Sequence, residues 1–250
     1  MGRVKGVVLC GGEGKRLRPI TYYFQKTMIP IGRSQRPLLE YVLRLFKFHG
    51  IMEVILLVGY KAEQIVNYFE DGSRFNINVT YVYDDPKIKG TAGAIVNAYR
   101  KGAINRDDTL LVYYGDILTN MNLTDFLNYH RGKNAQATIA LSRGFSLRVG
   151  VADLGKDGRI TRFKEKPEYE KPVSIAIAAL EGETLQSMEE LIKNKRELDL
   201  MGEVIPYIME KKDRVYGYIT DAFWYDVGST EAYEKLDAGT VDKALSFLYT

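Results

Sequence analysis

A short stretch near the start of the chain combines glycine with positive charge. The sequence GGEG at residues 11–14 follows the apolar run Val7–Cys10, and Lys15, Arg16 and Arg18 come directly after it. Glycines at the end of a strand let backbone N–H groups close around phosphate oxygens. An arginine beside them can neutralise the phosphate charge with its planar set of donors. The stretch therefore indicates an anion site, and a glycine turn next to a solvated basic face is the alternative.

Two common phosphate-binding loops do not fit this stretch. A P-loop needs a glycine five residues before Gly14, and that position holds Leu9. A dinucleotide-binding fingerprint that begins at Gly12 needs glycine or alanine where Leu17 stands. The anion site must therefore be of another kind.

Two aspartates occur at or after predicted strands. Asp116 comes after the apolar run Thr109–Tyr113, and Asp226 ends the strand-like run Phe223–Asp226. Ligands of α/β sheets bind at the carboxyl ends of the strands, and Mg²⁺ prefers one or two carboxylates together with phosphates and water. An aspartate in such a position can also cap a helix, so each residue alone leaves both interpretations open.

The elements that would position these residues alternate along the first half of the chain. Short apolar runs typical of buried strands alternate with segments whose apolar residues recur at helical spacing. The expected strands are Val4–Cys10, Val54–Val58, Val79–Tyr83, Thr109–Tyr113 and Ala137–Leu141, and the expected helices are Leu38–His49, Ala62–Phe69, Ala92–Tyr99 and Leu123–Tyr129. This alternation predicts an α/β fold with a mostly parallel central sheet and helices on both faces.

The second half of the chain has a different rhythm. Val149–Leu154 and Arg159–Lys164 flank the turn sequence Lys-Asp-Gly at residues 156–158, which predicts an inserted antiparallel hairpin. Further strands are expected at Ser174–Leu180, Val215–Ile219 and Phe223–Asp226, and helices from Glu183 and from Thr230. No linker or repeat interrupts this order, so residues 1–250 are expected to form one domain.

Composition limits the classes of function. The 250 residues are 46% apolar and carry a net charge of +3, which favours a sizeable core and argues against nucleic acid or a membrane surface as the main partner. A single cysteine, Cys10, excludes an internal disulfide, and with two histidines a zinc site is not expected. No long apolar segment is present. We therefore expect a cytoplasmic protein, and leave open whether it forms a homo-oligomer.

Several motifs in a fixed order resemble those of the sugar-1-phosphate nucleotidylyltransferases. The motifs are GGEGKRLRPIT at 11–21 followed by Lys26 and MIPI, GTAGAI at 90–95, YYGD at 113–116, FKEKP at 163–167 and WYDVGSTEAY at 224–233. The resemblance implies a Rossmann-like three-layer sandwich. It also implies Mg²⁺-dependent transfer of a nucleotidyl group from an NTP to a sugar 1-phosphate, with release of pyrophosphate.

The resemblance implies roles for particular residues. The catalytic residues would be Arg16, Lys26 and Asp116, and Asp116 and Asp226 would hold the metal. The nucleotide would be bound by Leu9, Gly11, Gly12, Gly14, Lys15, Arg16, Asp85, Gly90 and Thr91, and the sugar phosphate by Gly150, Glu165, Lys166 and Ser174. The nucleotide part would span about residues 1–142 and the sugar-phosphate part about 143–235. Taken alone, Lys26 could be a solvated loop lysine, and Glu165 and Lys166 an exposed charge pair.

The chain departs from the family pattern at several positions. Gln25 stands where proline usually precedes the lysine, Lys15 where threonine is common, and Ala176 where a glycine usually borders the sugar pocket. The sequence ends at Thr250, so the left-handed β-helix found after this domain in many relatives is not expected. A non-catalytic regulatory subunit would be expected to lose Arg16, Lys26 or a metal carboxylate, and it is the second hypothesis for this chain.

Base choice depends on the loop around Asp85. In the family a polar side chain near this position reads the pairing edge of the base. A carboxylate only accepts hydrogen bonds, and guanine offers N1–H and N2–H₂ side by side. The sequence therefore favours GTP and, by family association, mannose 1-phosphate over UTP or dTTP with glucose 1-phosphate. The alternative is that residues 84–86 form a solvated turn and the backbone near Leu9 and Gly11 reads the base.

Overall fold

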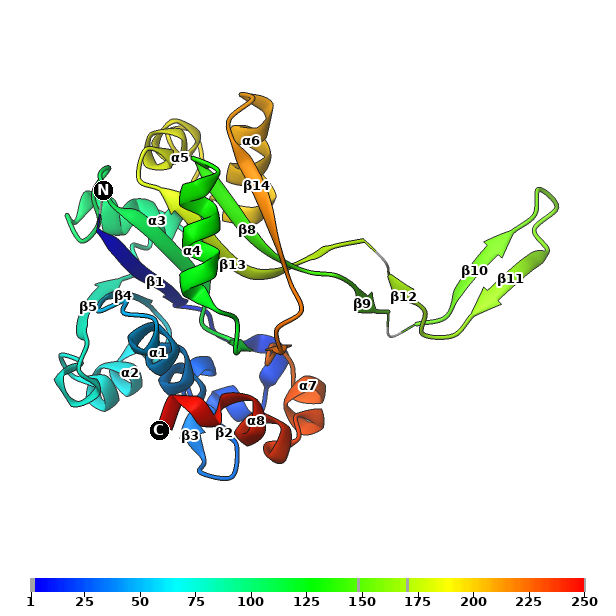
Figure 1. The fold of residues 1–250 in the computed structure, drawn as a ribbon, viewed down its shortest axis with the longest axis horizontal. Helices are drawn as coiled ribbons and strands as arrows, with labels where there is room; N and C mark the ends of the chain where they lie inside the picture. Colours follow the sequence, from blue (N-terminus) through cyan, green and yellow to red (C-terminus); the bar gives the residue numbers. More distant parts are fainter. Residues whose placement is uncertain (1–2, 148, 170, 250) are drawn as a thin grey trace.

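The computed structural model describes residues 3–147, 149–169 and 171–249, and a seven-stranded sheet forms the centre of this part (Figure 1). The sheet has the strand order β14-β8-β13-β6-β1-β4-β5. Its strands are β1 (Val4–Cys10), β4 (Glu53–Val58), β5 (Asn78–Tyr83), β6 (Thr109–Tyr114), β8 (Ala137–Ser142), β13 (Val173–Glu181) and β14 (Val215–Thr220). Only β13 runs antiparallel to its neighbours, β6 and β8. The predicted mostly parallel α/β sheet is confirmed.

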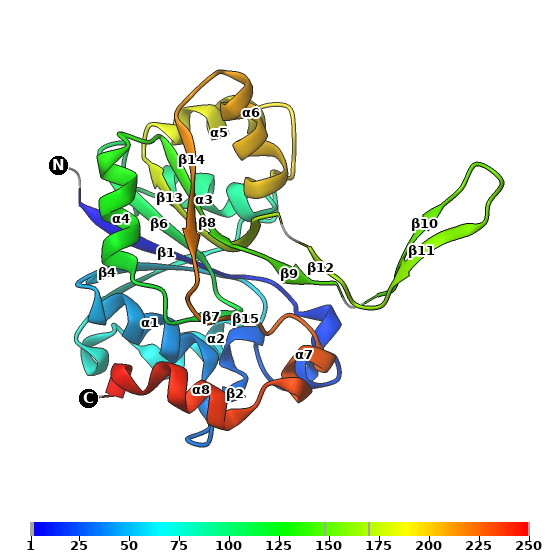
Figure 2. The ribbon, with the colours of Figure 1, turned by 45° about the vertical axis from the view of Figure 1, so that its right-hand side comes forward.

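Helices cover both faces of the sheet (Figures 1 and 2). Adjacent residues Val7 and Val8 of β1 are both fully buried but belong to different apolar clusters, because successive side chains of a strand point to opposite faces. One cluster includes residues of α1 (Leu38–Phe48), α2 (Ala62–Phe69), α4 (Leu123–Gly132) and α8 (Ala238–Leu245). The other includes residues of α3 (Thr91–Arg100), α5 (Thr184–Ile192) and α6 (Ile205–Glu210). The fold is therefore a three-layer sandwich.

Several short elements lie in the connections between these strands and helices. They are the 3₁₀ turns η1 (Lys15–Leu17), η2 (Ile20–Tyr22), η3 (Lys26–Met28) and η4 (Ser73–Phe75), the π-helical η5 (Leu200–Val204), and the strands β2 (Pro30–Ile31), β3 (Arg36–Pro37), β7 (Ile117–Thr119) and β15 (Trp224–Asp226). The chain then continues through α7 (Thr230–Lys235) and α8 to η6 (Ser246–Tyr249). β15 pairs with β7, so residues 224–226 lie next to the segment that follows β6.

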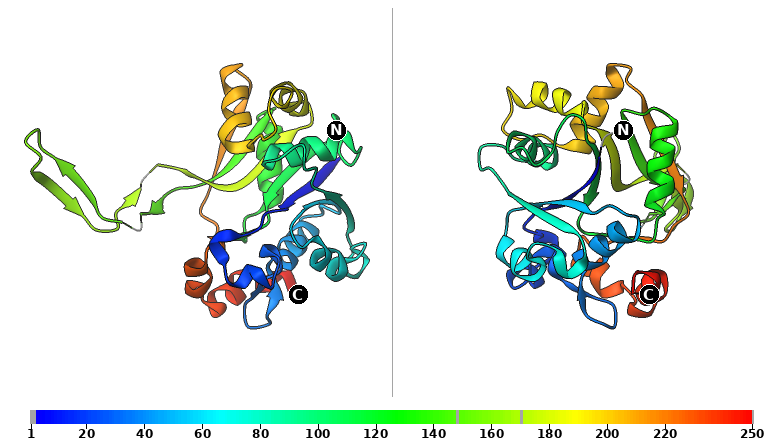
Figure 3. Two further views of the ribbon diagram at one scale, coloured as in Figure 1. Left: turned by 180° about the vertical axis from the view of Figure 1, so that it is seen from behind. Right: turned by 60° about the vertical axis from the view of Figure 1, so that its left-hand side comes forward.

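A long arm leaves the body between β8 and β13 (Figures 1 and 3). It consists of β9 (Phe145–Ser146), β10 (Val151–Leu154), β11 (Ile160–Lys164) and β12 (Glu168–Tyr169), and we refer to residues 145–147 and 149–169 as the arm. β10 pairs antiparallel with β11, as the sequence predicts, and β9 pairs with β12. Every residue of β10 and β11 is exposed. Among the described residues, no helix is long and apolar enough to cross a membrane.

Candidate active site

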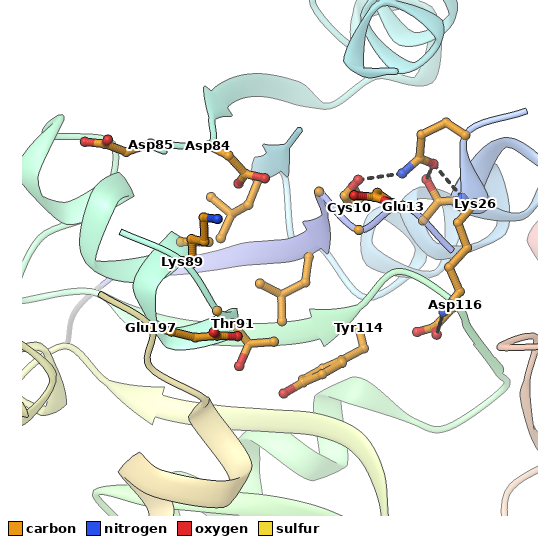
Figure 4. A pocket seen from close by; sticks show the side chains of 18 of the residues that line it. Cys10, Glu13, Lys26, Asp84, Asp85, Lys89, Thr91, Tyr114, Asp116 and Glu197 are labelled. Atoms are coloured by element: carbon orange, nitrogen blue, oxygen red, sulfur yellow. Dashed lines mark hydrogen bonds and ion pairs between the residues drawn. The ribbon is translucent and has the colours of Figure 1, made fainter. Parts of the chain in front are cut away.

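A cavity of about 660 Å³ lies at the carboxyl ends of β1, β4, β5 and β6 (Figure 4). Parallel α/β sheets bind ligands at this edge, and the volume falls in the range of small-molecule sites. Its lining combines the glycine-rich loop with residues that follow neighbouring strands. The lining residues are Leu9, Cys10, Gly11, Gly12, Glu13, Lys15, Gln25, Lys26, Thr27, Leu57, Asp84, Asp85, Pro86, Ile88, Lys89, Gly90, Thr91, Ala94, Tyr114, Asp116 and Glu197.

The glycine-rich loop after β1 separates this cavity from a second one of about 400 Å³. Gly14 directly precedes the 3₁₀ turn η1 and has a φ of +62°, a backbone conformation that favours glycine. No atom would contact a Cβ at Gly12 within 4 Å, so this part of the loop is open. The second cavity is lined by Glu13, Gly14, Lys15, Arg16, Lys26 and Gly228. Basic side chains and open backbone therefore meet between the two cavities, as an anion site requires.

Lys26 and Asp116 form an ion pair at one end of the cleft (Figure 4). Their side chains are 16% and 17% exposed, so water screens the pair only in part. Lys26 begins η3, and Asp116 lies in the turn between β6 and β7. The pair therefore joins two loops that are 90 residues apart in the sequence.

Asp226 lies beside Asp116 because β15 pairs with β7. Asp226 is opposite Ile117, and the N–H of the next residue, Val227, donates to the carbonyl of Asp116 over 2.9 Å. Loss of surrounding water raises the pKa of Asp226, and the negative charge of Asp116 raises it further. The two neighbouring carboxylates can supply oxygen ligands to one hard cation, which would complete its shell with phosphate and water. No group of three or more metal-ligating side chains occurs within the described ranges.

Arg16 is close to Asp226. Its guanidinium Nη2 lies 2.9 Å, and Oδ1 of Asp226 2.6 Å, from the point that a Cβ on Gly228 would occupy. Both charged groups thus crowd around Gly228, and any other residue there would displace one of them. The positive charge of Arg16 lowers the pKa of Asp226, against the larger raising effects of desolvation and Asp116. The structure thus brings Arg16, Lys26, Asp116 and Asp226 together from three distant parts of the chain.

The loop after β5 presents two aspartates with different surroundings. Oδ1 of Asp85 accepts from the N–H of Lys87 over 2.8 Å, so Asp85 stabilises its own turn. The carboxylate of Asp84 instead lies 2.4 Å from the point that a Cβ on Gly11 would occupy, and desolvation raises its pKa. The two side chains point in different directions (Figure 4). Both residues line the cavity, so Asp85 stays the predicted base-reading residue and Asp84 is a second candidate.

Gly90 and Thr91 lie at the opposite wall. Gly90 has a φ of +84°, and a Cβ there would come within 2.4 Å of the carbonyl oxygen of Leu198. Glycine is therefore required by the close approach of two backbone segments, whatever the ligand. The hydroxyl of Thr91 donates to Asp199 over 2.9 Å and accepts from the N–H of Leu200 over 2.7 Å. This wall is thus tied to the segment before α6, which also supplies Glu197, a lining residue that no motif indicated.

The predicted sugar-phosphate residues are not brought to this cleft. Gly150, Glu165 and Lys166 are exposed on the arm, and Ser174 lies at the root of the arm on β13. Gly150 and Glu165 are neighbours there, since a carboxylate oxygen of Glu165 lies 2.8 Å from the point that a Cβ on Gly150 would occupy. Ala176, also on β13, has a φ of +58°, a conformation that would suit the glycine it replaces.

Fold and cleft together define an α/β protein with a cavity at the carboxyl edge of its sheet, where a glycine-rich loop meets basic side chains. The family described as Nucleotidyl transferase matches residues 5–243. The chain belongs to this family, and the resemblance of its motifs is confirmed.

The names of similar proteins give different substrates. A UTP--glucose-1-phosphate uridylyltransferase from Synechocystis is 30% identical over 97% of the chain and 64% of its own length. A mannose-1-phosphate guanylyltransferase from Mycobacterium tuberculosis is 32% identical over 96% of the chain and 65% of its own length. The chain thus spans less than two thirds of these relatives. A D-glycero-alpha-D-manno-heptose 1-phosphate guanylyltransferase from Aneurinibacillus thermoaerophilus is 31% identical over 93% of the chain and 96% of its own length.

Solved structures share the fold. A Bacillus anthracis protein provisionally described as a glucose-1-phosphate thymidylyltransferase has a TM-score of 0.76 at 22% identity, with 96% of each chain covered. HddC from Yersinia pseudotuberculosis, complexed with GMP-PN, has a TM-score of 0.69 at 20% identity, with 93% of this chain and 97% of HddC covered. At these identities the likeness establishes the architecture alone.

Proposed function

We propose that this chain transfers a nucleotidyl group from a nucleoside triphosphate to a sugar 1-phosphate and releases pyrophosphate, with Mg²⁺ as its metal. The observation that carries the proposal is the convergence of Arg16, Lys26, Asp116 and Asp226 beside an open glycine-rich loop. The names of the relatives support the same reaction class. A regulatory subunit that only binds nucleotide sugars is disfavoured, because all four charged residues are present.

The proposed reaction joins two anions. A phosphate oxygen of the sugar 1-phosphate attacks the α-phosphorus of the NTP, and the bond from that phosphorus to the pyrophosphate oxygen breaks. Arg16 and Lys26 counter the negative charge that develops on the transferring and leaving groups. Asp116 and Asp226 would hold Mg²⁺, which supplies Lewis-acid stabilisation of phosphate oxygens when bound. Lys26, already paired with Asp116, has its ammonium fixed close to the proposed metal position.

Base choice would follow from the carboxylates after β5. Asp84 and Asp85 both line the larger cavity, and an ionised carboxylate only accepts hydrogen bonds. Guanine presents two adjacent donors and suits a carboxylate, whereas the pairing edge of uracil or thymine alternates acceptor, donor and acceptor. We therefore propose GTP, and by family association mannose 1-phosphate, with UTP or dTTP and glucose 1-phosphate as the alternative.

Sugar-phosphate recognition is assigned to the second part of the chain, about residues 143–235, and nucleotide binding to about residues 1–142. Gly150, Glu165 and Lys166 are the proposed sugar-phosphate residues on the arm, with Ser174 at its root. Two of them, Gly150 and Glu165, are already adjacent. Lys166 is exposed and suited to pair with a phosphate, although it lies outside the cleft that Lys26 and Asp116 line.

A substrate panel tests the proposal. Pyrophosphate release is measured with five NTPs against mannose, glucose and related sugar 1-phosphates, each with Mg²⁺. We expect GTP with mannose 1-phosphate to give the highest kcat/KM. No release with any pair would reject the enzymatic function and favour a binding role. A preference of about tenfold or more for UTP or dTTP, equal to about 1.4 kcal/mol, would reject the carboxylate argument.

Two matched variants refine the base assignment. Asp84→Asn and Asp85→Asn each add a donor and remove a charge at one of the two candidate positions. The residue that reads guanine should lose selectivity for GTP by about tenfold or more when changed, since a mismatched hydrogen-bonding edge is costly in a pocket. If both variants keep the GTP selectivity of the wild type, base reading would be assigned to the backbone near Leu9 and Gly11.

A further inference from the structure

A fully buried glutamine stands directly before the lysine of the cleft. Gln25 has a side chain with 0% exposure, although glutamine is a residue that is mostly found on surfaces. Its backbone φ and ψ are −62° and 142°. Proline, which usually occupies this position in the family, would also fix φ near −65°. The chain therefore has the backbone conformation of a proline with a polar side chain in the core.

The amide group of Gln25 connects the two loops that carry the cations. Its Nε2 donates to the carbonyl of Cys10 over 2.5 Å, and Cys10 is the residue directly before the glycine-rich loop. Its Oε1 accepts from the N–H and the hydroxyl of Thr27, over 2.5 and 2.7 Å. The two bonds to Oε1 cap η3, the turn that begins with Lys26. One side chain thus holds the start of the phosphate loop and the turn that presents the lysine.

The two loops are also in direct contact. Cβ of Lys26 lies 3.2 Å from the point that a Cβ on Gly14 would occupy, which leaves no room for another residue between the loops. The backbone N–H of Gln25 donates to Oε1 of Gln64 over 2.6 Å, and Nε2 of Gln64 donates to the carbonyl of Tyr23 over 2.7 Å. Gln64 therefore anchors the outer side of the Gln25 loop to α2, while the Gln25 side chain anchors its inner side to β1.

We propose that Gln25 is a positioning residue that fixes the ammonium of Lys26 relative to the glycine-rich loop, and this inference rests on the proposed function. Both acceptor bonds and the donor bond are made in a buried place where the lost partners cannot be replaced by water. Removing the amide frees η3 to shift against the loop. A displacement of a catalytic group by about 1 Å can cost about 10²-fold in rate.

The test is a double-mutant cycle between Gln25→Met and Lys26→Ala. Gln25→Met keeps the length of the side chain and removes its hydrogen bonds. We expect each single variant to lower kcat by about 10- to 100-fold. The double variant should be within about threefold of Lys26→Ala alone, because without the ammonium there is nothing left for Gln25 to position. Losses that multiply in the double variant would overturn the proposal and leave a structural role.

A second readout separates this inference from the proposed function. The affinity for inorganic pyrophosphate, measured by calorimetry on the same variants, should show the same non-additive pattern. If the wild type binds pyrophosphate but transfers no nucleotide, the proposed function fails while this cycle still decides the role of Gln25. Additive losses of pyrophosphate affinity reject the positioning role whatever the activity.

Matched variants guard against loss of folding. Gln64→Met removes the outer anchor and keeps the Gln25 amide, so its kcat should stay within about threefold of the wild type. If Gln25→Met does not fold, Gln25→Glu is used in the same cycle. It keeps an acceptor for Thr27 and places an oxygen against the Cys10 carbonyl. A loss with Gln64→Met as large as that of the Gln25 variant would contradict the assignment to the Gln25 side chain.

Discussion

The cleft and the arm differ in how firmly each holds its proposed functional residues. In the cleft, Lys26 and Asp116 are less than one fifth exposed, paired with each other and tied to neighbouring loops. On the arm, Lys166 is exposed, and the ribbon that carries it is surrounded by solvent on both faces (Figure 3). The proposed nucleotide side is therefore held in place in the chain alone, and preorganised charges are the condition for strong electrostatic stabilisation of a transition state.

This difference predicts that variants in the two regions will affect different kinetic constants. Residues held rigidly at the reacting phosphates should act mainly on kcat, whereas a residue on an exposed arm should act mainly on capture of the second substrate. Variants in the two regions can break or sharpen this distinction.

The largest effect is expected from the cleft carboxylates. Asp116→Asn and Asp226→Asn should each lower turnover by at least about 10²–10³-fold, because each removes a proposed metal ligand, and the protein should remain folded. Turnover is measured at limiting Mg²⁺, with folding checked by circular dichroism. Asp153→Asn, an exposed carboxylate on the arm, is the control. Near-normal turnover in either cleft variant would remove that residue from the metal site.

Arg16→Ala should have the next largest effect. Its guanidinium lies near Asp226, so we expect kcat to fall by about 10²-fold while the KM for NTP changes less. Steady-state kinetics with varied NTP measure both constants. Arg18→Ala is the matched control, since Arg18 is paired with Glu13 and is not assigned to the substrates. A variant that raises KM and leaves kcat unchanged would make Arg16 a ground-state contact.

Lys166→Ala should act on the other substrate. Loss of a charged hydrogen bond, about 1.5–3 kcal/mol, should raise the KM for sugar 1-phosphate by tenfold or more, with a smaller change in kcat. Lys164→Ala, two residues earlier on the same ribbon, tests whether net charge alone is responsible. If Lys166→Ala lowers kcat as strongly as Arg16→Ala, the contrast between arm and cleft is wrong.

The smallest effect is expected for the stability of the arm. Phe163 is 61% exposed, so Phe163→Ala should change the free energy of unfolding by no more than about 0.5 kcal/mol. Leu56→Ala, at a fully buried position of β4, should cost about 2–5 kcal/mol. Urea unfolding of both variants measures the difference. A cost above about 2 kcal/mol for Phe163→Ala would mean that the arm is packed against other protein in solution.

Local patterns in the sequence are sufficient for most of the fold. The apolar runs that become β1, β4, β5, β6 and β8 and the helical spacing of α1, α2, α3 and α4 predict the parallel sheet with its covering helices. Burial of a strand on both faces leaves a continuous apolar run that can be read without knowing its neighbours. The same holds for the turn sequence of the arm, because hairpin pairing depends on adjacent residues.

The sequence by itself was sufficient to predict the class of reaction and to name the charged residues of the cleft, because the motifs are local and occur in a fixed order. Only the tertiary structure decided which residues meet. Asp116 and Asp226 become neighbours through the pairing of two short strands, β7 and β15, whose three residues each carry too little pattern to predict a partner. The side chain of Gln25 meets the carbonyl of Cys10, 15 residues earlier, only in the folded chain, and its proposed positioning role depends on that bond. Periodicity along a chain reports which side chains are buried, whereas contacts between distant segments depend on how the packed layers are joined.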